Sequence, residues 1–157
     1  MLKDLGAEPV VCDVFDAAAL TEAVAAFRPD QVFHQLTDLP DNVAELSGHR
    51  QRNDRIRTEG TRNLLAAAGA AAMIAQSISW EVPGEGGRAA AEHERLVLSA
   101  GGVVIRYGQF FGPGTFYPDA PPDQPRIHVD EAARRSLTGL DMPSGVTMVI
   151  DDRAADG

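Results

Sequence analysis

The chain has 157 residues, 44% of them hydrophobic and 24% charged, which fits a single globular domain. Its net charge of −9 disfavours nucleic acid and anionic membrane surfaces as partners. Cys12 is the single cysteine, which excludes an intrachain disulfide, and no basic region followed by an apolar core begins the chain, so a cytoplasmic location is expected.

Short β-branched runs alternate with longer helical patterns along the chain. This alternation is typical of the α/β class, in which crossover helices join parallel strands. The first four predicted strands have the continuous apolar character of buried parallel strands. The predicted strands are residues 9–13, 31–34, 73–77, 102–106 and 147–150.

The first predicted helix has clear signals at both ends. Asp16 can cap its start, and Leu20, Val24 and Phe27 follow with helical spacing. Pro29 ends it, because a proline disfavours helical backbone in the residue before it. The helix and the flanking strands predict a βαβ unit.

Further helices are expected within residues 53–68, ending at Gly69, and over about 88–100. After Phe111 the chain is rich in proline, which predicts an irregular segment. A short helix is expected to follow it, around residues 131–140.

Several segments carry motifs that occur in a fixed order. They are residues 10–14, 32–34, the Gly-Thr-x-Asn-Leu-Leu motif at 60–65, 73–79, 103–106 with the Gly-Pro-Gly turn at 112–114, and 127–133. In this order they resemble the extended short-chain dehydrogenase/reductase family, the NAD(P)-dependent epimerases and dehydratases. The resemblance implies a Rossmann-like fold, NAD or NADP as cofactor, and a small-molecule metabolite such as a nucleotide sugar as substrate.

The resemblance also implies roles for particular residues. The cofactor-binding residues it implies are Asp13, Val14, His34, Ser77 and Arg106, with Asp13 and Val14 on the adenine side. Ser77 and Ser79 correspond to serines that hydrogen-bond the substrate, although serines after a strand are also ordinary turn formers. His93 could act as an acid or base, or could be a core histidine. The histidines and Cys12 have no metal-ligand spacing, so no metal site is expected.

Two hallmarks of the family are not found. The family's first strand and glycine-rich turn, which hold the cofactor's pyrophosphate at a helix N-terminus, have no counterpart, and Met1 falls within the helix before the third strand. The third strand, residues 9–13, must therefore pair with the fourth, swap between chains or stay loose. Residues 31–34 become a sheet edge, which favours self-association.

The second missing hallmark is the Tyr-x-x-x-Lys pair that transfers the proton. Gly86 and Ala90 stand at the two positions, and Lys3 is the sole lysine. The sequence at 84–89 formally matches Gly-x-Gly-x-x-Gly/Ala, but Pro83 and its neighbours separate it from the preceding strand, so we interpret it as a turn. A group of basic residues can be a phosphate site or a solvated helix face; it comprises Arg50, Arg52, Arg55, Arg57 and Arg62.

The sequence thus predicts a partial Rossmann-like parallel sheet that lacks the first two strands. Residues 1–110 are expected to form the partial NAD(P)-binding domain and 111–157 a partial substrate-binding segment. The expected protein is epimerase/dehydratase-like and oxidoreductase-like, with impaired cofactor binding and catalysis. The alternatives are a non-enzymatic remnant or binding module, and a fragment of a longer NAD(P)-dependent oxidoreductase whose first strands are encoded upstream of Met1.

Overall fold

A computed structural model describes residues 3–151 of the chain. Its centre is a parallel four-stranded sheet in the order β1-β2-β3-β6, with a separate two-stranded pair β4-β5. The strands are β1 (Gln31–His34), β2 (Ala72–Ile78), β3 (Val103–Tyr107), β4 (Gln109–Phe111), β5 (Arg126–His128) and β6 (Gly145–Val149). The expected α/β fold with a parallel sheet is confirmed, and β1 is an edge strand as expected.

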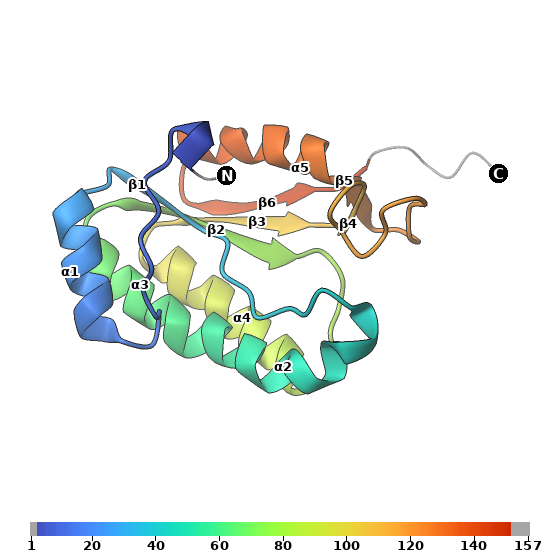
Figure 1. Ribbon diagram of the computed structural model, residues 1–157, viewed down its shortest axis with the longest axis horizontal. Helices are drawn as coiled ribbons and strands as arrows, with labels where there is room; N and C mark the ends of the chain where they lie inside the picture. The colour runs from blue at the N-terminus through green and yellow to red at the C-terminus, as the bar shows by residue number, and fades with distance from the viewer. Residues whose placement is uncertain (1–2, 152–157) are drawn as a thin grey trace.

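Helices cover both faces of this sheet (Figure 1). The α-helices are α1 (Ala17–Phe27), α2 (Leu46–Arg55), α3 (Thr61–Ala68), α4 (Glu85–Ser99) and α5 (Val129–Ser136). A π-helical segment, Ile56–Gly60, joins α2 to α3, and 3₁₀ turns occupy Lys3–Leu5, Val43–Glu45 and Leu137–Asp141. In Figure 1, α5 lies above the sheet, and α2, α3 and α4 lie below it.

The two central strands, β2 and β3, are buried on both faces, which explains their continuous apolar sequence. Side chains alternate between two core clusters because neighbouring residues of a strand point to opposite faces. Ile74 and Ile105 belong to the cluster between the sheet and α5, whereas Ala75 and Val104 belong to the cluster between the sheet and α3 and α4. The sheet therefore separates two apolar layers.

Helix α1 begins and ends where the sequence predicts. The Asp16 carboxylate accepts a hydrogen bond from the Ala19 backbone N–H at 3.0 Å, which satisfies a donor of the first turn. Arg28 takes a left-handed conformation with φ of 55°, and Pro29 follows it. The predicted βαβ unit is only half formed, because the segment before α1 is not a strand.

The prediction of a strand at residues 9–13 is wrong. The segment has no ladder partner, Val10 is 61% exposed, and Val11 is fully exposed. Among the described residues, β1 pairs only with β2, and no strand pairs with the other edge of β1, on which this segment could have continued the sheet. Instead, Val14 lies against Gly60, and the Asn63 side chain donates a hydrogen bond to the Val14 carbonyl at 3.0 Å. In this chain the segment is therefore unpaired, and the residue that follows it is held by Gly60 and by α3.

The β4-β5 pair was not predicted, and the second helix begins earlier than expected, at Leu46. The last predicted strand is confirmed as β6, which pairs with β3 in the main sheet. The short predicted helix corresponds to α5 and the following 3₁₀ turn. The division of the chain into two parts at residue 110 stays a prediction.

Candidate functional site

A cavity of about 760 Å³ opens where β1, β2 and β3 end. Ligands of open α/β sheets bind outside the carboxyl ends of the strands, so this is the expected place for a site. Its wall is mostly apolar and rich in aromatic rings. The main apolar residues of the wall are Leu36, Leu39, Val43 and Leu46 after β1, Ile78, Trp80 and Val82 after β2, and Phe110, Phe116 and Tyr117 after β3.

The floor of the cavity holds two buried histidines joined through a threonine. His34 Nε2 lies 3.0 Å from Thr61 Oγ1, which lies 2.7 Å from His93 Nδ1. His93 Nε2 lies 2.9 Å from the carbonyl oxygen of Gln76. The carbonyl can only accept, so His93 Nε2 carries the proton, Thr61 donates to His93 Nδ1, and His34 Nε2 donates to Thr61.

Both imidazole rings are neutral in this arrangement. Burial, and to a smaller extent the neighbouring His93, lower the pKa of His34 from 6.5 to about 4. Burial also lowers the pKa of His93, although its hydrogen bond to Gln76 acts in the opposite sense. Both nitrogens of His93 are engaged, so the structure places it as a hydrogen-bonded core residue that also borders the cavity.

Ser77 is part of a second polar group, with Glu94 and Arg106. The Ser77 hydroxyl donates to Glu94 Oε1 at 2.6 Å, and the Arg106 guanidinium donates to both Glu94 oxygens at 2.9 and 2.6 Å. Burial raises the pKa of Glu94, but the hydrogen bonds from Arg106 and Ser77 outweigh burial, and the net pKa is lowered. Glu94 therefore stays ionised and orients Ser77.

The residues predicted from the sequence are only partly brought together. His34, Ser77 and His93 line the cavity, whereas Asp13, Val14, Ser79 and Arg106 do not. The Asp13 carboxylate accepts from the Phe15 N–H at 2.9 Å. The Ser79 hydroxyl is buried without a hydrogen-bond partner among the described residues. Their proposed roles stay predictions.

Sequence reasoning missed Tyr107, Trp80 and Arg57 as cavity residues. Tyr107 is the last residue of β3, and its hydroxyl lies 2.6 Å from that of Ser136 on α5. Burial raises the pKa of Tyr107, so the phenol is protonated. The position of Tyr107 at the carboxyl end of a buried strand was an available signal, whereas Trp80 lies in a loop with no pattern.

The described residues do not form a complete dinucleotide site. The backbone of Val82 occupies the space beside the glycines at the start of α4, because a Cβ atom at Gly87 would collide with the carbonyl oxygen of Val82. No other glycine-rich turn joins a strand to a helix within residues 3–151. The backbone donors that would hold a pyrophosphate are therefore not formed in this part of the chain.

No helix in the described part is long and apolar enough to cross a membrane. Within the same residues, no group of three or more histidine, cysteine, aspartate or glutamate side chains could hold a metal ion.

Comparison with solved structures identifies the class of fold. UDP-glucose 4-epimerase of Thermus thermophilus, in complex with NAD, has a TM-score of 0.72 and 18% identity, and the match covers 90% of this chain and 63% of that chain. RMD of Pseudomonas aeruginosa, complexed with NADPH, has a TM-score of 0.72 and 18% identity, with 92% and 66% covered. The chain thus has the Rossmann-like fold of these two structures, and the fold class expected from the sequence is confirmed.

A curated reductase is related to this chain in sequence. It is a 3-diazoavenalumate denitrifying reductase of a Streptomyces species, 37% identical, and the match covers 69% of this chain. The match covers 44% of the length of that relative and 63% of the length of the Thermus thermophilus epimerase. No family model matches the chain.

Proposed function

We propose that this chain forms the substrate-binding part of an NAD(P)-dependent reductase and that it binds a small aromatic molecule. The observation that carries the proposal is the apolar, ring-lined cavity at the carboxyl ends of β1, β2 and β3. The sequence relationship to a reductase supports the reaction class. The relative's name specifies a diazo compound as its substrate. The proposal of an aromatic ligand for this chain rests on the lining of the cavity and not on diazo chemistry.

An aromatic ligand fits the cavity better than a nucleotide sugar does. Sugar hydroxyls and phosphates need many hydrogen-bond partners, and leaving such groups unpaired in a buried site costs about 1–3 kcal/mol each. The polar groups of the floor are already engaged with each other, because His34 and His93 share Thr61 and Ser77 is bound to Glu94. The floor of the cavity therefore offers few free donors and acceptors to a polyol.

Trp80 provides a direct readout of binding. It is the single tryptophan of the chain, it lines the cavity, and it is 39% exposed. We expect saturable quenching of its fluorescence by cinnamamide and cinnamate, and no quenching by UDP-glucose. NAD(H) and NADP(H) are expected to bind with at best about millimolar affinity, because the pyrophosphate cradle is not formed by the described residues.

A matched pair of variants tests whether the ligand occupies this cavity. Leu39 lines it and is 47% exposed, so Leu39→Glu adds a carboxylate to the apolar wall without burying it completely. This variant should weaken cinnamamide binding. Leu137→Glu changes a leucine that is 58% exposed and lies outside the cavity, and it should leave binding unchanged. Quenching by UDP-glucose with no response to the aromatic ligands would refute the proposal.

A further inference from the structure

Arg57 differs from three of its four basic neighbours in having no ion-pair partner within contact distance. Three of the five arginines that the sequence groups together are ion-paired on the surface: Arg52 with Asp38, Arg55 with Glu59, and Arg62 with Glu92. Arg57, in the π-helical segment between α2 and α3, lines the cavity instead. Among the described residues, its guanidinium makes no hydrogen bond or ion pair within the usual distances.

The surroundings of Arg57 leave its charge poorly compensated. It is half-buried, and burial lowers its pKa, whereas the charges of Asp54 and Glu94 act in the opposite sense without outweighing burial. Glu94 is already bound by Arg106 and Ser77, so it is not available as a full partner. An arginine remains charged in proteins, so a cavity of this kind presents a positive charge that lacks a close anion.

Arg57 is also the one cationic side chain on the described wall, since the histidines that line it are neutral. The other ionised residue of the wall is Asp41, which is exposed and therefore screened by water. A ligand that enters this cavity with an anionic group thus finds a single site for it. A planar guanidinium matches a carboxylate in a two-point hydrogen-bonded pair.

We propose that Arg57 binds the carboxylate of the aromatic ligand, so that the substrate class is aromatic carboxylic acids. This inference rests on the proposed function of the same cavity. One arginine in an apolar wall suits a singly charged group, whereas a diphosphate would bring more charge than the cavity can compensate. Arg57 is therefore a specificity-determining residue.

The test compares cinnamate with cinnamamide, which have nearly the same shape and differ in charge. With the unaltered chain, we expect cinnamate to bind at least about tenfold more tightly, as measured by Trp80 quenching and calorimetry. Arg57→Gln should weaken cinnamate binding by about the same factor and leave cinnamamide unchanged. Arg57→Lys keeps the charge but loses the two-point geometry, so its preference should be intermediate.

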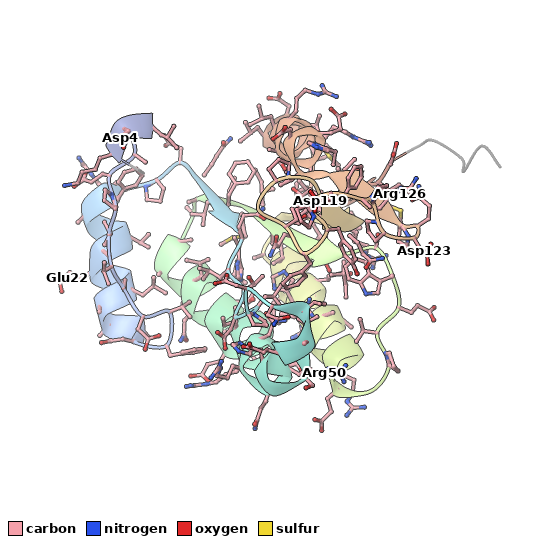
Figure 2. All side chains as sticks on the ribbon, turned by 45° about the vertical axis from the view of Figure 1, so that its right-hand side comes forward. Asp4, Glu22, Arg50, Asp119, Asp123 and Arg126 are labelled. Carbon is pink, nitrogen blue, oxygen red and sulfur yellow. The ribbon has the colours of Figure 1, made fainter. Side chains whose placement is uncertain are left out.

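Arg50→Gln is the matched control, because Arg50 is an exposed arginine of α2 outside the cavity, labelled in Figure 2. It should not change either affinity. Circular dichroism and thermal unfolding establish that Arg57→Gln is folded, and its unchanged binding of cinnamamide is a second check. If neither ligand binds the unaltered chain, the proposed function fails. If both bind equally, or if inorganic phosphate displaces cinnamate at lower concentration, the carboxylate assignment alone is overturned.

Discussion

Thr61 is hydrogen-bonded to both buried imidazole rings. It is fully buried, and its hydroxyl accepts from His34 and donates to His93. Thr61→Val keeps the shape but leaves a ring N–H of His34 and a ring nitrogen of His93 unpaired. At about 1–3 kcal/mol for each of these two buried unpaired groups, we expect the free energy of unfolding to fall by about 2–6 kcal/mol.

Urea unfolding followed by circular dichroism measures this loss. Thr21→Val is the matched control, because Thr21 is exposed on α1 and its hydroxyl bonds only to the Ala17 carbonyl of its own helix. It should change stability by less than about 0.5 kcal/mol. Equal effects of the two substitutions would show that the histidine–threonine connection contributes nothing.

The same histidines make the fold sensitive to mild acid. The pKa of His34 is lowered by burial from 6.5 to about 4, so below pH 6.5 the unfolded chain binds a proton that the folded chain does not. The contribution of neutral, buried His34 to the free energy of unfolding is therefore fully present above pH 6.5, the pKa in the unfolded chain. It is lost as the pH falls toward 4. From about pH 7 to about pH 5, His34 alone should remove roughly 2 kcal/mol.

Unfolding by urea at a series of pH values between those limits measures the loss, and His93 should add to it because burial lowers its pKa too. Glu94 stays ionised over this range, so its titration does not interfere. His34→Gln should reduce the pH dependence whatever it does to the absolute stability. An unchanged dependence in this variant would contradict the assignment.

At the scale of elements, the sequence predicts best what is determined locally. The cap at Asp16 and the proline after Arg28 define α1 because both act within a few residues. The β4-β5 pair and the unpaired segment at 9–13 depend on partners distant in sequence. Residues 9–13 have the composition of a buried strand, but no described strand lies beside them, so composition alone misassigns the segment.

Two glycines at the same position of different helices should respond to alanine in opposite ways. Gly48 and Gly87 are each the third residue of their helix, α2 and α4. A Cβ atom at Gly48 meets nothing within 4 Å, so Gly48→Ala should stabilise the chain by about 0.5–1 kcal/mol through its helix propensity. At Gly87 the new atom would collide with the Val82 carbonyl, so Gly87→Ala should destabilise the chain despite the same propensity gain.

Thermal unfolding of the two variants measures this difference. Because Val82 and Trp80 both line the cavity, Gly87→Ala should also shift the emission of Trp80, whereas Gly48→Ala should not. Stabilisation by both substitutions would mean that the loop before α4 adjusts freely and does not rest on Gly87.

At the scale of the whole molecule, the edge strand β1 is exposed. It pairs with β2 on one side, has no partner on the other among the described residues, and carries no charged side chain, since His34 is neutral. Phe33 on this strand is 39% exposed. Such edges pair with other chains, so we expect light scattering to report a dimer or larger species.

Phe33→Lys should shift this species toward monomer, because a lysine on an edge strand opposes pairing. Phe27→Lys is the matched control, since Phe27 is 68% exposed at the end of α1 and outside the sheet. The same shift in both variants would indicate general loss of surface hydrophobicity, and a monomeric unaltered chain would exclude association through β1.

Only part of the candidate site could be predicted from the sequence. His34 and Ser77 were found because they lie at or near the carboxyl ends of predicted strands, where parallel sheets bind ligands. Arg57, Trp80 and Tyr117 come from a helix and two loops that converge on the cavity only in the folded chain. No spacing in the sequence shows which arginine of a basic group turns inward.

The place of β6 in the sheet affects how the chain is made. β3 is hydrogen-bonded to β2 on one side and to β6 on the other, and β6 begins only at Gly145. When β1, β2 and β3 have left the ribosome, one edge of β3 therefore still has no partner strand. Until β6 emerges, the backbone N–H and C=O groups on that edge of β3 have no strand partner and are accessible to chaperones and to neighbouring chains. A premature stop codon before Gly145 would make that transient exposure permanent.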